Sequence, residues 1–103
     1  MLNSQQLKHF KTFGFVVIKN VFTPEELITI NQEFKHRSEV ASEYTDFDGS
    51  VRHNLRMMGN DTPFFASLLE DTRFAETAEQ MFGDVIGFNI DADRYTGDTV
   101  WHY

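Results

Sequence analysis

The sequence predicts a mixed α+β fold, and three kinds of observation support this prediction. Several segments begin with helix-capping residues and continue with apolar side chains at helical spacing. Other segments alternate apolar and polar residues with the period of a half-buried strand. Hydrophobic residues make up 41% of the 103 residues, which is enough for one core, so we expect a single domain spanning residues 1–103.

The first predicted helix starts near Asn3, whose side chain can accept a hydrogen bond from a free backbone N–H of the first turn. Gln6 follows three residues later, as a capping box requires. Gly14 predicts the end of this helix, because glycine adopts the left-handed conformation found at helix C-termini. The β-branched and aromatic residues 15–18 then favour a short strand.

Thr23, Pro24 and Glu26 give the clearest local signal, because they supply an N-cap, a first-turn proline and a capping-box carboxylate. We expect the helix that they start to run to about Arg37. The apolar stripe that we expect to face the core consists of Leu27, Ile28, Ile30 and Phe34. The side chains that we expect to face water are Glu25, Glu26, Gln32, Glu33 and Lys35.

Two shorter helices are predicted in the second half of the chain. Thr62 and Pro63 repeat the cap-then-proline start and lead into a short apolar helix. Another helix is predicted to begin near Asp71 or Thr72 and to stop at Gly83.

Strand patterns lie on both sides of these helices. Residues 51–57 alternate, and the side chains predicted to share one face are Val51, His53, Leu55 and Met57. Residues 86–93 alternate in the same way, with Ile86, Phe88, Ile90 and Ala92 on one face. Residues 99–103 resemble the opening of a further strand.

Charge and composition narrow the functional class. The formal net charge is −7 and the Lys and Arg residues never cluster, so we expect no nucleic-acid partner. No segment approaches the roughly 20 apolar residues needed to cross a bilayer, so we expect no membrane insertion. The chain has no Cys, which excludes a disulfide framework and fits a reducing compartment. We therefore expect a cytoplasmic protein.

The elements, taken in order, resemble the phytanoyl-CoA dioxygenase family of Fe(II)/2-oxoglutarate-dependent oxygenases. In that family a helix leads into a stretch of the form GF/Y-x-V-x-x-x-V-F/L-x-x-E-E. The residues that match this stretch here are Gly14, Phe15, Val17, Val21, Phe22, Glu25 and Glu26. The C-terminal Trp101-His102 is similar to the family's tryptophan and first iron-ligand histidine. The resemblance covers most of the chain, and residues 1–27 are its most specific part.

The resemblance implies a role for His102 as a metal ligand. The family's carboxylate ligand stands two residues after this histidine, which is the position immediately after Tyr103. Residues two apart on a strand project from the same face, so a histidine and a carboxylate at this spacing can bind one metal ion.

The resemblance also implies cofactors, a substrate and a fold. The cofactors are Fe(II) and 2-oxoglutarate, and the substrate is a small molecule that the sequence does not identify. The fold is a double-stranded β-helix, or jelly-roll barrel, whose first strands carry N-terminal helices. Asn89 and Arg94 are expected to contact 2-oxoglutarate or substrate. Because the family's second histidine and 2-oxoglutarate anchor lie in its C-terminal half, we expect an N-terminal dioxygenase fragment that is inactive alone.

Two alternatives stay open. The chain could be a truncated, non-catalytic binding or oligomerising module in which a second copy covers the open sheet edges and forms a homodimer. It could also be a small acidic α+β protein in which His102 is an ordinary strand histidine. In either case Asn89 and Arg94 would belong to a solvated face or turn.

Overall fold

The computed structural model describes residues 1–40, 49, 52–84, 87 and 89–94. Its helices are α1 (Ser4–Phe13), α2 (Pro24–Val40), α3 (Pro63–Ser67), the 3₁₀ helix η2 (Leu68–Glu70) and α4 (Thr72–Phe82). Its strands are β1 (His53–Arg56) and β2 (Asp91–Arg94), which pair in an antiparallel sheet. The predicted α+β class is therefore confirmed.

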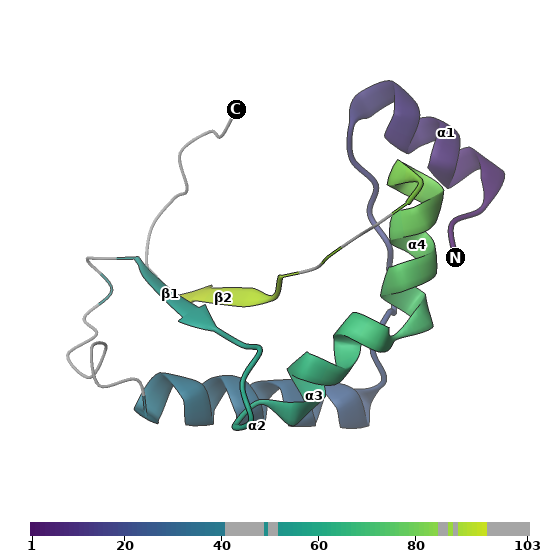
Figure 1. Ribbon diagram of the computed structural model, residues 1–103. Coiled ribbons are helices and arrows are strands. Elements are labelled where there is room, and N and C mark those ends of the chain that lie inside the picture. The colour runs from purple at the N-terminus through teal and green to yellow at the C-terminus, as the bar shows by residue number, and fades with distance from the viewer. Residues whose placement is uncertain (41–48, 50–51, 85–86, 88, 95–103) are drawn as a thin grey trace.

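Helix α2 forms the base of the molecule (Figure 1). Helix α3 packs against α2, and the chain continues through η2 into α4, which rises away from the base and meets α1. The β1–β2 sheet lies above the other part of α2. Within the described residues, none of the helices combines the length and the apolar composition needed to span a bilayer.

Both ends of α1 are fixed by the residues that the sequence predicted. The side-chain oxygen of Asn3 accepts a hydrogen bond from the backbone N–H of Gln6 at 2.9 Å, and the side-chain oxygen of Gln6 accepts one from the N–H of Asn3 at 2.9 Å. Gly14 ends the helix at a φ of 80°, and its N–H donates to the carbonyl of Phe10 at 2.7 Å. This helix is confirmed at both boundaries.

Helix α1 is held on α4 by backbone and aromatic contacts. The side-chain amide of Gln80 donates to the carbonyl of Leu2 at 3.0 Å and accepts from its N–H at 2.8 Å. The rings of Phe10 and Phe82 meet edge to face, with their centroids 5.5 Å apart. The N-terminal helix is therefore anchored near the far end of α4.

The strand predicted at residues 15–18 is wrong, because these residues have no regular secondary structure. Phe15, Val17 and Ile18 are exposed to 57%, 67% and 43% respectively. Strand propensity expresses itself through packing on a neighbouring strand, and within the described residues no strand pairs with this segment. The segment is an extended connection between α1 and α2.

Helix α2 starts with the predicted capping box. The hydroxyl of Thr23 accepts from the N–H of Glu26 at 3.1 Å, and the Glu26 carboxylate accepts from the N–H of Thr23 at 2.9 Å. The helix continues past the expected end at Arg37 and reaches Val40.

The predicted orientation of α2 is wrong at Glu33, which was expected to face water and is 9% exposed. Its carboxylate accepts hydrogen bonds from the backbone N–H groups of Phe64 at 2.7 Å and Phe65 at 3.0 Å. These N–H groups belong to the first turn of α3, so Glu33 caps a neighbouring helix. Leu27 and Ile28, which were expected to face the core, are 46% and 58% exposed.

The two later helices start where the sequence predicted. Helix α3 begins at Pro63 after Thr62, but the Thr62 side chain makes no capping hydrogen bond and donates instead to the carbonyl of Met57. Asp71 is the N-cap of α4, where its carboxylate accepts from the N–H of Arg73 at 2.9 Å. Gly83 ends α4, as expected.

The sheet pairs His53 with Arg94, Asn54 with Asp93, Leu55 with Ala92 and Arg56 with Asp91. Directly opposed residues of an antiparallel pair share a face, so Leu55 and Ala92 lie together. Leu55 and Met57 are 1% and 0% exposed, and they pack with Phe34 of α2 and Phe65 of α3. The helices therefore cover the face of the sheet that carries Leu55 and Ala92.

Both strands are shorter than the predicted alternating segments. Strand β1 confirms that His53 and Leu55 share a face, since alternate residues of a strand point the same way. Strand β2 begins at Asp91 rather than at the start of the segment 86–93. The predicted strand residues that lie outside the described part of the chain are Val51, Ile86, Phe88 and 99–103.

Candidate functional site

In the described part of the chain, the side of the sheet that faces away from the helices carries only polar side chains. Because Leu55 and Ala92 point toward the helices, their strand neighbours point the other way. These neighbours are Asn54, Arg56, Asp91 and Asp93, and together they are called the polar sheet face. Asn54, Arg56 and Asp91 are exposed and Asp93 is half-buried.

Asp93 is the most strongly bound member of the polar sheet face. Its carboxylate accepts from the side-chain amide of Asn54 at 2.9 Å and from Nε of Arg52 at 2.8 Å, and the Nη2 group of Arg52 donates to it as well. These hydrogen bonds, with that from Asn54 first, hold the pKa of Asp93 below its ordinary value. Asp93 therefore stays ionised, and its charge is balanced by Arg52.

Arg56 and Asp91 are the other opposed pair on this face. In the described part of the chain no ion pair joins the two side chains. Asp91 instead accepts a hydrogen bond from the side-chain amide of Asn89 at 3.0 Å. One guanidinium and one carboxylate thus stand side by side on an open surface.

The structure does not bring the predicted site residues Asn89 and Arg94 together. Asn89 contacts Asp91, whereas Arg94 lies opposite His53 on the helix-covered face. Within β2, Arg94 points to the face opposite to that of Asp91 and Asp93, because successive residues of a strand point to opposite sides. The two side chains therefore have different surroundings, and each assignment stays a prediction.

The described residues do not form an iron site by themselves. No group of three or more His, Cys, Asp or Glu side chains in the described part of the chain is arranged to hold a metal ion. The predicted ligand His102 lies outside the described residues. Its role therefore stays a prediction that follows from the resemblance.

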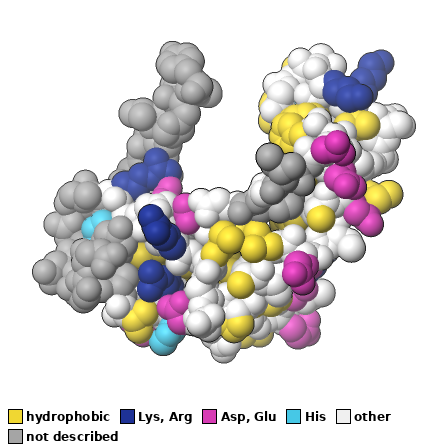
Figure 2. Space-filling view, viewed as in Figure 1, with side chains coloured by type: hydrophobic (Ala, Val, Ile, Leu, Met, Phe, Trp, Pro, Cys, Tyr) yellow, Lys and Arg dark blue, Asp and Glu magenta, His cyan; other side chains and the backbone are white. Residues whose placement is uncertain are grey.

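An apolar groove of about 540 Å³ runs between the segment before α2, helix α4 and the residues before β2. Ile18, Phe22, Phe74 and Ile90 line it, and Asn89 stands among the few polar lining residues. Figure 2 shows apolar side chains exposed over the middle of the molecule, between the sheet and α4. Asn89 thus links this groove to the polar sheet face.

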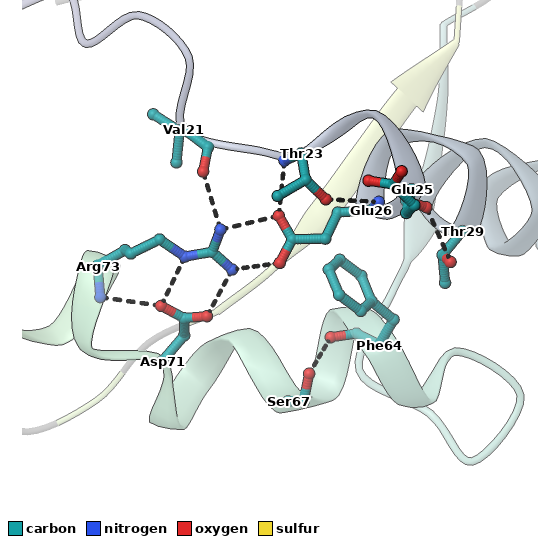
Figure 3. Close-up of polar contacts among 9 residues, drawn as sticks. All are labelled: Val21, Thr23, Glu25, Glu26, Thr29, Phe64, Ser67, Asp71 and Arg73. Carbon is teal, nitrogen blue, oxygen red and sulfur yellow. Dashed lines mark hydrogen bonds and ion pairs between the residues drawn. The ribbon is translucent and has the colours of Figure 1, made fainter.

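Arg73 joins the starts of α2 and α4 (Figure 3). Its guanidinium donates to both carboxylate oxygens of Glu26 at 2.8 Å, to the two oxygens of Asp71 at 3.0 and 2.7 Å, and to the carbonyl of Val21 at 2.8 Å. These contacts use all five N–H donors of a guanidinium. Arg73 also lies 5.5 Å from the ring centroid of Phe22. Since every donor is occupied, we assign Arg73 a structural role.

The Arg73 contacts change the pKa values of the groups they join. Hydrogen bonding to Arg73 is the main cause that lowers the pKa of Glu26 and of Asp71 below their ordinary values. The two carboxylates, with Asp71 first, raise the pKa of Arg73. The cluster is therefore fully ionised at neutral pH.

The contacts of Arg73 with Glu26 and Asp71 could not be predicted from the sequence. Glu26 and Asp71 were each identified as capping residues, but no local signal pairs either of them with Arg73. The alternating pattern of β1 and β2 did predict which residues share a face. It did not predict which face the helices cover.

Comparisons with protein-family models, with curated proteins and with solved structures gave no match to this chain. A functional assignment must therefore come from the sequence resemblance and from the geometry of the described residues.

Proposed function

We propose that this chain is the N-terminal part of an Fe(II)/2-oxoglutarate-dependent dioxygenase of the phytanoyl-CoA dioxygenase type. The helices would pack on the outside of the first strands of a jelly-roll barrel, and His102 would be the first iron ligand. Fe(II) and 2-oxoglutarate would supply the oxidising chemistry for hydroxylation of a small molecule. We further propose that the protein acts in the cytosol, since a chain without Cys suits a reducing compartment.

The observation that carries the proposal is the two-sided character of the β1–β2 pair. One face packs on α2 and α3 through Leu55 and Met57, and the other face is polar and has no helix of the described part of the chain over it. A barrel with a polar interior needs strands of this kind, with one side covered and the other lining the hollow. Strand β2 ends at Arg94, residues 95–100 separate it from Trp101, and the strand proposed to carry His102 lies outside the described residues.

The decisive experiment begins with the codons that follow the one for Tyr103. The proposal predicts an aspartate codon at once and a long continuation that supplies the second histidine and a basic residue. The protein made from the whole reading frame should release succinate from 2-oxoglutarate when Fe(II) is present. The variant His102→Ala should lose this activity, whereas the control His36→Ala, an exposed residue of α2, should keep it. An active His102→Ala enzyme would exclude the assigned ligand.

A second candidate function is an oligomerising module. The sheet has two strands, so within the described residues each strand pairs on one side only and leaves its other edge open. Open edges can pair with a second copy of the chain. Analytical ultracentrifugation of the 103-residue chain tests this candidate. A dimer would support it, and a well-folded chain that stays monomeric would contradict it.

A further inference from the structure

Two members of the polar sheet face, one of each charge, form no ion pair within the described part of the chain. Asp93 is bound by Arg52 and Asn54, so its charge is balanced within the sheet. Arg56 and Asp91 remain, directly opposed in the antiparallel register. The Cβ atoms of such a pair lie about 4.5–5.5 Å apart, close enough for one small molecule to contact both side chains.

We infer that the pair Arg56 and Asp91 is a binding site for a zwitterionic small molecule. The guanidinium of Arg56 would donate to an anionic group of the ligand, for which its planar donors are suited. The carboxylate of Asp91 would accept from a cationic ammonium group. The inference rests on the proposed function in one respect, namely that the polar sheet face lines the hollow where a substrate would lie.

Two neighbouring contacts hold the pair in place. The side-chain amide of Asn89 donates to Asp91 at 3.0 Å, so Asn89 is a positioning residue that leaves the other oxygen of Asp91 for the ligand. The carbonyl of Arg56 accepts from Nε of Arg37 at 3.0 Å, which ties this end of β1 to α2. The backbone of Arg56 is therefore fixed by α2, and the carboxylate of Asp91 is oriented by Asn89.

The same pair disfavours a purely apolar ligand. A hydrocarbon covering Arg56 and Asp91 would remove both charges from water without replacing their hydrogen bonds, which is unfavourable. A molecule with a single charge would make a charge-assisted contact with only one of the two side chains. A zwitterion is the ligand class that satisfies both.

Three probes with the same five-carbon skeleton separate these cases. Amide chemical shifts of the ¹⁵N-labelled protein are followed in iron-free buffer during titration with 5-aminopentanoate, pentanoate or pentylamine. We expect 5-aminopentanoate to shift the amides of residues 54–56 and 91–93 and to bind at least about tenfold more tightly than either singly charged probe. That factor corresponds to one charge-assisted hydrogen bond.

Two variants identify the contacts. Arg56→Gln and Asp91→Asn should each lower the affinity for 5-aminopentanoate about tenfold, to the level of the singly charged probes. Both residues are exposed, so the spectra of the variants should otherwise match that of the parent protein. The control Lys35→Gln removes an exposed charge on α2 and should bind as the parent does.

Equal affinity for pentanoate and 5-aminopentanoate would overturn the inference, as would unchanged affinity in both variants or no binding at all. Because the titration contains no iron, its failure leaves the oxygenase proposal untouched. In the same way, a reading frame without the expected aspartate codon would remove the oxygenase proposal but not a measured binding site.

Discussion

The substitution Glu33→Gln tests the contact between α2 and α3 most sharply. In the native protein the two carboxylate oxygens of Glu33 accept from the N–H groups of Phe64 and Phe65 at 2.7 and 3.0 Å. A glutamine has one carbonyl oxygen, so its amide N–H₂ group would face one of these donors. The variant therefore loses one charge-assisted hydrogen bond and leaves a helix N–H group without an acceptor.

The expected loss follows from the value of such contacts. A hydrogen bond to a charged group contributes about 1.5–3 kcal/mol, so Glu33→Gln should lower the free energy of unfolding by about 2 kcal/mol. At about 4–8 °C per kcal/mol for a domain of this size, the Tm should fall by about 8–16 °C. Thermal and guanidinium unfolding followed by circular dichroism give both quantities.

A matched control is available in the same helix. Glu25 is exposed in the first turn of α2, and Glu25→Gln should change the stability by less than about 0.5 kcal/mol. If Glu33→Gln lowers the free energy of unfolding by no more than Glu25→Gln does, the carboxylate does not cap α3. The packing of α2 on α3 would then have another origin.

Three other predictions concern the Arg73 cluster, the loop before α3 and the activity of the chain. Since the pKa values of Glu26 and Asp71 are lowered by folding from their ordinary 4.5 and 3.8, their contribution to stability is complete above these values and is lost as the pH falls below them. Arg73→Gln should reduce the Tm at pH 7 and make the Tm less dependent on pH between about 5 and 2. A Tm that falls as steeply with decreasing pH in the variant as in the parent protein would contradict this. Thr62→Val should cost about 1–2 kcal/mol in urea unfolding, because the buried hydroxyl of Thr62 donates to the carbonyl of Met57 at 2.6 Å, whereas Thr62→Ser should keep most of the stability; equal losses in the two variants would rule out the hydroxyl as the cause. The 103-residue chain with Fe(II) should release negligible succinate from 2-oxoglutarate, and robust succinate formation would refute the proposal that it is inactive alone.

The helix ends could be predicted because their causes are local. The capping box of Asn3 and Gln6 and that of Thr23 and Glu26 each join residues three apart in the sequence. The left-handed residue Gly14 likewise acts on the turn before it. Such signals involve only a few neighbouring residues, and the structure confirms the helix ends that they predicted.

The incorrect predictions concern features that depend on residues far away in the sequence. Residues 15–18 have the composition of a strand, but a strand also needs a neighbour to pair with. Helical periodicity places Glu33 on the polar side of α2. In the structure it is buried, because its carboxylate accepts hydrogen bonds from the first N–H groups of α3. Periodicity within one helix carries no information about a second helix more than thirty residues away in the sequence.

In the candidate site, too, local patterns could be predicted and long-range contacts could not. Alternation in β1 and β2 predicts that Asp91 and Asp93 share a face, but only packing on α2 and α3 decides that this face is the open one. The separation of Asn89 from Arg94 follows from the same packing. The sequence could not predict that Arg56 and Asp91 face each other, because this depends on the register between two strands that are distant in the sequence.

We propose that the side of the sheet away from the helices faces an iron-containing hollow. An experimental structure of the protein made from the whole reading frame, with Fe(II) bound, tests this claim most directly. We expect the imidazole of His102 to bind the metal on the same side of the sheet as Asp91 and Asp93. A metal bound elsewhere, or an imidazole on the helix-covered side with Leu55, would contradict it.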